Sequence, residues 1–244
     1  MTTIIHTTGT NLFEVHVQKF NAGTSIYTPN PDMKYCVVEM TAGGGGGASC
    51  STTVLIAASG GGAAYARKLF TNIDIGTGQQ VIVGTKGLAG LIATDGGTSS
   101  LGTILHCNAG TSANGLIGGL GGAAGTLGDL EIGGEDAKNA SGQFAYVPGM
   151  AVVNIPKGGN SHLGFGGEAE LVFNSAESIT LVHNGNLPKG YGSGGGGSFG
   201  ENALGADGKD GIVIITEYCW TAPTNTLDGT AITDFCFDSV VCPV

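Results

Sequence analysis

The sequence predicts a mainly β and irregular fold: a sandwich or bundle of polyglycine-II helices with flanking β-strands and little α-helix. Three observations lead to this prediction. Glycine accounts for 47 of the 244 residues, many glycines recur at every third position, and runs of β-branched residues flank the glycine-rich region. A three-residue period matches an extended left-handed helix with about 3 residues per turn and a rise of about 3.1 Å per residue. Such a helix has no internal backbone hydrogen bonds, so glycine along one edge lets neighbouring rods approach and bond to each other.

The triplet glycines occur in short stretches that are separated by slips in register. The stretches are Gly84 to Gly90; Gly115, Gly118 and Gly121; Gly122, Gly125 and Gly128; and Gly205, Gly208 and Gly211. None is long enough for collagen, which needs glycine at every third position throughout. Disorder is disfavoured because 41% of the residues are hydrophobic and only 11% are charged. We expect Gly87 and Gly118, which lie within triplets, to tolerate no larger residue.

The acidic composition argues against several classes of partner. The formal net charge is −10, and the nine Lys and Arg residues cluster nowhere beyond Arg67 and Lys68. This disfavours a nucleic-acid groove and binding to an anionic membrane. Residues 96–128 carry no Asp, Glu, Lys or Arg, but their Gly, Ser, Thr and Asn content is too polar for a transmembrane helix. The N-terminus has no signal-peptide pattern, so we expect synthesis in a cytosol.

Strands are expected on both sides of the glycine-rich region. Residues 12–18 alternate apolar and polar side chains, as a half-buried strand does, and a turn at residues 27–32 leads to a second strand at 35–40. The remaining strand signals lie at residues 81–83 and 211–218, with a hairpin formed by 171–173 and 179–182. The best helix signal covers residues 63–70, which is about two turns.

One motif, GGxSxLG, is repeated along the chain. It occupies residues 96–102 and 158–164, and residues 197–200 form a looser relative. A catalytic residue has no reason to recur in this way. We therefore expect the repeated serine to hydrogen-bond backbone at the end of a rod, while the following Leu or Phe fills the core.

No recognised catalytic or metal-binding motif is present, so we expect no enzyme activity, no cofactor and no metal. The GxGxxG match at residues 192–197 follows no strand and opens no helix, which removes its value as a dinucleotide site. The five histidines are not at metal-ligand spacing. Spacing alone leaves a paired-carboxylate glycosidase open, because such carboxylates meet only in the fold. The cysteines expected to be buried free thiols are Cys36 and Cys107, and those close enough in sequence to allow one disulfide are Cys219, Cys236 and Cys242.

An ordered series of motifs runs through most of the chain. In order, the motifs are Val37–Glu39, Gly43–Gly47, Gly60–Tyr65, Val83–Gly90, the two GGxSxLG boxes, Gly190–Gly200 and Gly205–Tyr218. This series resembles the glycine-rich domain of phage tail fibres and receptor-binding tip proteins, including the adhesins that cap the long tail fibres of T-even-like phages. The resemblance covers residues 25–218. It implies that the glycine boxes form a scaffold and that the variable segments between them form loops that touch a host receptor.

The resemblance also carries expectations about function. It implies a tail fibre tip adhesin that is located on the virion, is assembled in the host cytoplasm, and recognises a bacterial outer-membrane protein or lipopolysaccharide. Other virion or tail fibre proteins are expected partners, a homotrimer is one candidate assembly, and nucleic acid is not expected. The alternative is a structural virion component, such as a fibre collar or head decoration protein, without direct receptor binding.

The expected organisation has three parts. Residues 1–40 would hold N-terminal β-strands and a docking segment, 41–218 the polyglycine-II domain with its closing strand, and 219–244 a C-terminal tail. The chain departs from the capping adhesins because residues 1–26 contain no recognisable fibre-attachment module. Candidate receptor-binding residues come from stretches that break the glycine pattern, where aromatic residues stand among small polar ones. They are Phe144, Tyr146, His162, Phe165, His183, Asn184 and Tyr191.

Overall fold

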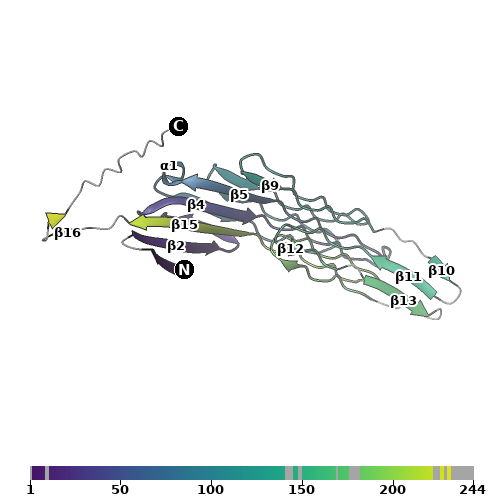
Figure 1. The fold of residues 1–244 in the computed structure, drawn as a ribbon. Coiled ribbons are helices and arrows are strands. Elements are labelled where there is room, and N and C mark those ends of the chain that lie inside the picture. Colours follow the sequence, from purple (N-terminus) through teal and green to yellow (C-terminus); the bar gives the residue numbers. More distant parts are fainter. Residues whose placement is uncertain are drawn as a thin grey trace, which may run out of the picture.

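The computed structural model shows an elongated bundle of rods that extends from a β-sandwich (Figure 1). The residues that it describes are 2–8, 11–140, 145–147, 150–168, 170–175, 182–221, 226–227 and 230–231. Strands and irregular segments dominate these residues, and the one helix among them is the short α1 (Asn72–Ile75). The prediction of a mainly β and irregular fold with little α-helix is confirmed.

A six-stranded antiparallel sheet closes one end of the molecule. Its strands, in spatial order, are β1 (Thr2–Thr8), β2 (Asn11–Phe20), β15 (Ile212–Thr221), β4 (Met33–Thr41), β5 (Tyr65–Thr71) and β9 (Leu130–Ile132). The strands predicted at residues 12–18, 35–40 and 211–218 are confirmed. Because β15 pairs with both β2 and β4, the last strand of the glycine-rich region and the N-terminal strands share one sheet. Residues 40 and 218, where domain borders were expected, lie inside β4 and β15.

A four-stranded sheet packs against the inner face of this sheet, and the main core lies between them. Its strands, in spatial order, are β3 (Gly23–Tyr27), β6 (Gln79–Val83), β7 (Ser99–Leu101) and β8 (Leu105–Cys107). The fully buried core includes Tyr27, Val38, Met40, Val81, Leu101, Leu105, Val213 and Ile215. Cys36 and Cys107 are buried free thiols, as predicted, and so are Cys50 and Cys219. Burial raises the pKa of Cys36 to about 11 and that of Cys107 to about 12.

Three smaller sheets complete the strand inventory. The sheet of β10 (Ala145–Val147), β11 (Met150–Ile155) and β13 (Glu170–Ser175) lies at the end of the molecule opposite the six-stranded sheet (Figure 1). The two-stranded sheets are β12 (Gly164–Phe165) with β14 (Lys189–Gly190), and β16 (Thr226–Leu227) with β17 (Thr230–Ala231). The strand predicted at 171–173 is therefore confirmed. Its described neighbour is β11, whereas residues 179–181 of the predicted hairpin lie outside the described residues and Val182 belongs to no strand.

The helix predicted at residues 63–70 is wrong, because this segment ends a rod and then forms β5. The pairing of β5 with β4 runs without interruption from Tyr35 opposite Thr71 to Thr41 opposite Tyr65. This register buries Phe70 in the core, where it contributes to the largest hydrophobic cluster. The helical preference of the alanines is worth only tenths of a kcal/mol per residue, roughly, and tertiary pairing outweighs it.

Residues 43–50 form a central rod whose hydrogen bonds follow the predicted three-residue period. Its successive N–H groups donate in turn to three neighbouring segments, each running antiparallel to it. Gly43, Gly46 and Ser49 donate to Gly97, Thr94 and Gly90; Gly44, Gly47 and Cys50 donate to Lys209, Ala206 and Ala203; and Gly45 and Ala48 donate to Gly61 and Ala58. A rod whose donors rotate through three directions in three residues is the hydrogen-bonding pattern of polyglycine II.

The carbonyl groups of the same rod bond to further segments, so the rod is enclosed on all sides. Gly43, Gly44 and Gly45 accept from Gly110, Gly87 and Gly195, respectively. A second central rod, residues 57–64, is enclosed in the same way. Its donors reach the segments around residues 192–198, 108–115 and 135. Its carbonyls accept from Gly119, Gly122 and Gly159, and from Gly45 of the first central rod. Every such bond is between rods, which compensates for their lack of internal bonds.

The position of a rod in the bundle explains its glycine pattern. Each glycine of the central rods faces another backbone, so a Cβ atom at Gly45 would lie 1.9 Å from the Thr111 oxygen and one at Gly61 would lie 2.0 Å from the Leu120 oxygen. A peripheral rod has only one inward edge, and its glycines recur every third residue. Those of the rod at residues 205–211 all face the first central rod: Gly205 faces Gly47, Gly208 faces Gly44 and Gly211 faces Thr41.

The same geometry bears on the two glycines singled out from the sequence. A Cβ atom at Gly87 would lie 2.2 Å from the Thr94 oxygen, and one at Gly118 would lie 2.6 Å from the Ala137 oxygen. Both distances are far shorter than a normal contact, and both opposing atoms belong to backbone. A larger side chain at either position therefore forces two rods apart.

Side-chain oxygens take the place of a neighbouring rod along the surface of the bundle. Carboxylate and amide groups of peripheral rods accept hydrogen bonds from outward-facing N–H groups of the adjacent rod. The pairs are Asp207 with Ala89, Asp210 with Lys86, Asp95 with Ser112, Asp136 with Gly121, Asn139 with Gly118 and Asn184 with Leu204, at 2.7–2.9 Å. Four of the acidic side chains, Asp95, Asp136, Asp207 and Asp210, are thus part of the frame that satisfies the backbone.

The repeated motif performs the predicted role at its serines, whereas the predicted filling of the core holds for Leu101 and Phe199 but not for Leu163, which is half-buried. Ser99 Oγ donates to the Thr41 carbonyl and accepts from the Gly84 N–H, both at 2.9 Å, and Leu101 is fully buried. In the second box Ser161 Oγ donates to the Tyr191 carbonyl. In the looser relative Ser198 Oγ accepts from the Cys50 N–H at 3.1 Å. The repeated serine therefore fixes the point at which one rod meets the backbone of another.

Candidate functional site at the distal end of the rods

The rods reverse direction in loops at the end of the bundle that faces away from the six-stranded sheet. We call residues 51–56, 91–93, 114–117 and 200–202 together the distal tip. Backbone hydrogen bonds hold them at one level: Gly200 donates to the Leu55 carbonyl at 2.9 Å, and Ala58 donates to the Gly115 carbonyl at 2.8 Å. Gly90 fixes the start of the loop at residues 91–93, because its carbonyl accepts a 2.8 Å hydrogen bond from the Ser49 N–H.

The distal tip exposes large aliphatic side chains and carries almost no charge. The most exposed are Ile92 at 92%, Leu91 at 66% and Ile117 at 63%; Val54, Leu55 and Leu116 are also exposed. Glu201 is the one charged residue in these loops, which contain neither Lys nor Arg. Single exposed apolar residues are normal on a protein surface, whereas the tip loops bring several together at the ends of the rods.

Short turns with their own hydrogen bonds hold the tip loops in place. Ser51 Oγ accepts from the N–H groups of Thr53 and Val54, and Asn114 and Ile117 exchange backbone bonds across a turn. That turn requires glycine, since Gly115 has a φ of 58°. Beneath the loops lies a second buried cluster, composed of small residues. Its members are Ala48, Cys50, Ala57, Ala58, Ala113, Ala140 and Ala203.

Two of the predicted contact residues lie close to the distal tip. His183 forms a backbone bridge with Phe199, with N–O distances of 2.7 and 2.9 Å, immediately before the loop that begins at Gly200. Asn184 Oδ1 accepts from the Leu204 N–H at 2.9 Å. The amide of Asn184 is therefore engaged in the frame, and the prediction that Asn184 contacts a receptor remains untested.

Three other predicted residues lie together at the sheet end of the bundle, on and beside β12 and β14. The His162 ring packs against that of Tyr65 in a tilted arrangement, with ring centroids 4.4 Å apart and an interplanar angle of 42°. Phe165 is 69% exposed and pairs with Lys189 across the two strands. The hydroxyl of Tyr191 accepts a 2.7 Å hydrogen bond from Lys19 Nζ. The structure thus brings these three residues together but separates them from the tip.

The last two predicted residues lie outside what the structure describes in full. Phe144 is outside the described residues. Tyr146 lies on β10 and its backbone pairs with Ala151, but its side chain is outside the described part of the chain. Their expected role as receptor contacts is therefore untested.

The aliphatic residues of the distal tip were missed by the sequence reasoning, which looked for aromatic residues. A usable signal was present, because Val54-Leu55, Leu91-Ile92 and Leu116-Ile117 are adjacent pairs of large aliphatic residues that interrupt the small, glycine-rich segments. Within a rod, successive residues face different neighbouring segments, so two large side chains in a row fit only where the rod ends.

The buried hydroxyl and thiol groups with raised pKa values lie in the cores rather than on the distal tip. Burial raises the pKa of the Tyr27 and Tyr65 hydroxyls, with added contributions from hydrogen bonds to Glu217 and Glu39. Burial also raises the pKa of the Cys50 thiol. Among the described residues, no cluster of His, Cys, Asp and Glu side chains has the arrangement of a metal site. No helix within the described ranges has the length and apolar character to span a membrane.

Comparison with known families agrees with the pattern of rods and closing strands. The family model described as a glycine-rich domain matches residues 19–218, and the chain belongs to this family. The match begins in β2, includes all the rods and ends in β15. No curated protein matches the chain.

Proposed function

We propose that the protein is a phage tail fibre tip adhesin that recognises a host cell-surface receptor through its distal tip. The observation that carries this proposal is the set of exposed aliphatic side chains in the rod-end loops, at the end of the molecule that also carries the sheet of β10, β11 and β13. Ile92 and Ile117 stand out from loops whose backbone is tied to the rods on both sides. A loop that is already ordered loses less entropy on binding, so a rigid frame favours recognition.

The proposed receptor is a bacterial outer-membrane protein or lipopolysaccharide. An uncharged aliphatic surface suits an apolar partner, because nothing charged must lose its hydration on contact. The protein would act on the virion after assembly in the host cytoplasm, bound to other tail fibre proteins or as a homotrimer, and it would bind rather than catalyse. The motif series in the sequence supports this proposal.

A matched pair of substitutions tests the role of the distal tip. Ile92→Ser changes a residue that is 92% exposed on the tip, and Ile73→Ser changes one that is 87% exposed on α1 at the sheet end. Both changes remove similar apolar surface without disturbing a core. We expect Ile92→Ser to weaken attachment of the purified protein to host cells, and Ile73→Ser to leave it unchanged. Equal attachment by the two variants would contradict the proposal.

Competition identifies the receptor class, and a further substitution examines the sequence-based contact. Purified lipopolysaccharide and outer-membrane proteins are added separately, and the one that blocks attachment is the receptor class. Tyr146→Ala is expected to reduce attachment without lowering the melting temperature. An unchanged attachment, or a protein that unfolds, would remove Tyr146 from the set of receptor contacts.

The second candidate is a structural virion component, and the outer face of the six-stranded sheet favours it. Trp220 is 49% exposed and Leu69 is 52% exposed there, and Tyr35 and Tyr218 stack with ring centroids 4.7 Å apart. Such a face suits contact with another virion protein. If this were the main role, Trp220→Ser would reduce incorporation into particles, while Ile92→Ser particles would still attach to cells.

A further inference from the structure

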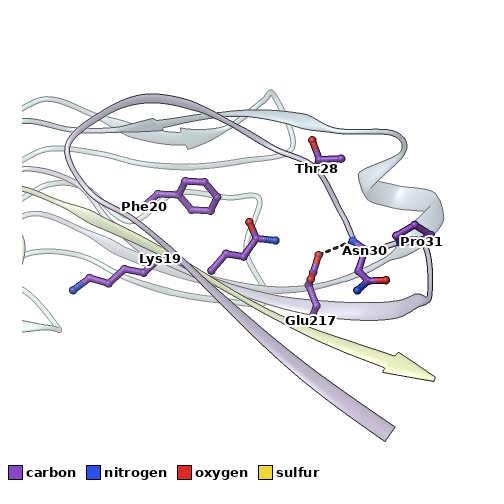
Figure 2. A pocket seen from close by; sticks show the side chains of 7 residues that line it. Lys19, Phe20, Thr28, Asn30, Pro31 and Glu217 are labelled. Atoms are coloured by element: carbon purple, nitrogen blue, oxygen red, sulfur yellow. Dashed lines mark hydrogen bonds between the residues drawn. The ribbon is translucent and has the colours of Figure 1, made fainter. Parts of the chain in front are cut away.

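A pocket of about 440 Å³ opens at the edge of the β-sandwich, away from the distal tip. It lies between β2 and β15 on one side and the segment that follows β3 on the other (Figure 2). Its walls combine hydrogen-bonding side chains with apolar surface. The residues that line it are Gln18, Lys19, Phe20, Thr28, Asn30, Pro31 and Glu217. Its size and mixed lining are those of a small-molecule site.

Glu217 is fully buried and brings an incompletely satisfied carboxylate to this pocket. Its Oε1 accepts from the Tyr27 hydroxyl at 2.8 Å and from the Asn30 N–H at 3.0 Å, the latter drawn in Figure 2. Its Oε2 has no hydrogen-bond partner among the described residues. A buried carboxylate oxygen without a donor costs more than a neutral unpaired group, so it calls for a donor from outside the chain.

A second unsatisfied acceptor lies next to Glu217 on the neighbouring strand. His16 is directly opposite Glu217 in the register of β2 and β15, is 7% exposed, and shares its face of β2 with Gln18. Its Nε2 is 3.0 Å from Glu14 Oε2, a contact that assigns the proton of a neutral ring to Nε2 and leaves Nδ1 as an acceptor. Nδ1 likewise has no partner among the described residues.

The nearest cationic side chain does not supply the missing donor. Lys19 Nζ donates to the Tyr191 hydroxyl at 2.7 Å and lies 5.1 Å from the centre of that ring. Figure 2 shows the Lys19 side chain directed away from Glu217. The interior of the pocket therefore holds the negative charge of Glu217 without a facing cation.

We infer that this pocket binds an amino sugar, whose ammonium group donates to Glu217 Oε2; His16 does not line the pocket. An ammonium group carries a positive charge and three donors, so it satisfies the carboxylate oxygen and compensates its charge. The amide and hydroxyl groups of Gln18, Thr28 and Asn30 suit the hydroxyls of a sugar ring. The ring of Phe20 offers the apolar face against which such a sugar packs. This inference does not depend on the adhesin proposal, since the site is at the opposite end of the rods.

Calorimetric titration of the full chain with D-glucosamine tests this inference, at mildly acidic pH where the amine is protonated. D-glucose and N-acetyl-D-glucosamine are titrated in parallel, because they keep the ring but lack the ammonium group. We expect D-glucosamine to bind at least about tenfold more tightly than either, the effect of one charge-assisted hydrogen bond. Equal affinities, or no binding of D-glucosamine, would overturn the inference.

Two variants locate the binding at Glu217 without relying on a single change. Glu217→Gln keeps the shape of the side chain and removes its charge, and it should abolish the preference for D-glucosamine. Gln18→Lys places an ammonium group in the wall of the pocket and should block the sugar by occupying its place. Gln80→Lys, at an exposed position of β6, makes the same charge change elsewhere and should bind normally. Should Glu217→Gln fail to fold, the comparison of Gln18→Lys with Gln80→Lys decides, and equal binding by these two would refute the site.

Discussion

Replacing Gly45 by alanine is the most direct perturbation of the rod packing. Gly45 lies in the middle of the first central rod, and its φ is outside the positive range, so alanine meets no conformational penalty there. A steric clash, however, disfavours alanine at this position. The new Cβ atom would lie 1.9 Å from the Thr111 oxygen and 2.4 Å from the Thr111 carbonyl carbon. Both are backbone atoms, which cannot rotate away as a flexible side chain would.

The expected cost follows from the hydrogen bonds that must break. An ordinary contact of a Cβ atom begins near 3.4 Å, so the two rods must separate by about 1.5 Å, which is enough to break a normal hydrogen bond. The bonds at risk are Gly45 to Gly61 and Gly61 to Thr111, both 2.9 Å long. Each buried group left unpaired costs about 1–3 kcal/mol. Alanine recovers about 0.4–1 kcal/mol through the unfolded chain, which leaves a net loss of about 3 kcal/mol.

Thermal unfolding followed by circular dichroism measures this loss. For a chain of this size about 3 kcal/mol corresponds to a fall in Tm of about 6–12 °C. Gly133→Ala is the matched control, because Gly133 is exposed and its Cβ atom would meet nothing closer than 3.4 Å. Its Tm should stay within about 2 °C of the parent or rise slightly. A Gly45→Ala protein as stable as Gly133→Ala would refute the close packing of the central rods.

Three further predictions concern the frame and the core. Asp207→Ala should lower the free energy of unfolding by about 1–2 kcal/mol, because it removes the acceptor of the Ala89 N–H and the partner of Lys86. Asp207→Asn should recover about half of this loss, because the amide oxygen still accepts. Urea titration measures both variants, and an equal loss in the two would contradict the role assigned to Asp207. Burial alone would raise the pKa of Asp207, but the bonds from Ala89 and Lys86 outweigh it and lower the pKa, and Lys189 lowers that of Glu168. Because the pKa values of these carboxyl groups are lower in the folded than in the unfolded protein, they contribute stability above about pH 4, which is lost as the pH falls through the folded values. Tm should therefore be flat down to about pH 5 and decrease below about pH 4. A Tm that rises on acidification would contradict this. Maleimide labelling, mapped by mass spectrometry, should modify Cys36, Cys50, Cys107 and Cys219 only after unfolding. All four cysteines are buried, and burial raises the pKa of their thiols. Rapid labelling of Cys107 in the native protein would contradict this and show that the core opens.

The rods were predictable because their chemistry is local and repetitive. Glycine at every third position already indicates one crowded edge, as at residues 205–211, and the five consecutive glycines from Gly43 to Gly47 indicate crowding on every edge. The strands were predictable for a similar reason, since alternation in residues 12–18 reports a half-buried sheet position. In both cases the period of the sequence equals the period of the backbone conformation.

The segment at residues 63–70 shows where local reasoning fails. Alanine favours a helix in isolation, but Ala63 and Ala64 occupy the end of a central rod, where a methyl group still fits and a helix does not. From Tyr65 onward the partner strand β4 decides the conformation, and that partner is distant in sequence. The pairing of β13 with β11 was missed for the same reason, because cross-strand partners depend on the topology of the bundle.

The candidate site was only partly predictable, because aromatic character does not report position. His162, Phe165 and Tyr191 lie in segments with the composition expected of binding loops. They are nevertheless located where the rods meet the sheet, in contact with Tyr65, Lys189 and Lys19, respectively. The pocket at Glu217 left no local signal either. Its parts come from β2, from the segment after β3 and from β15, and only the folded sheet brings them together.

The packing of the rods also separates the residues that carry the fold from those that are free to change. An interior glycine is fixed by the backbone atoms around it, and a surface acceptor such as Asp207 is fixed by the N–H group it satisfies. A tip residue such as Ile92 has neither constraint, because its side chain is 92% exposed and its loop is held through Gly90 at the rod end. Substitutions at the tip therefore change the surface offered to a partner while leaving the hydrogen bonds between rods intact. Under the proposed function, such a fold would let the binding surface diversify at little cost in stability, which is the physical reason to test recognition at the distal tip.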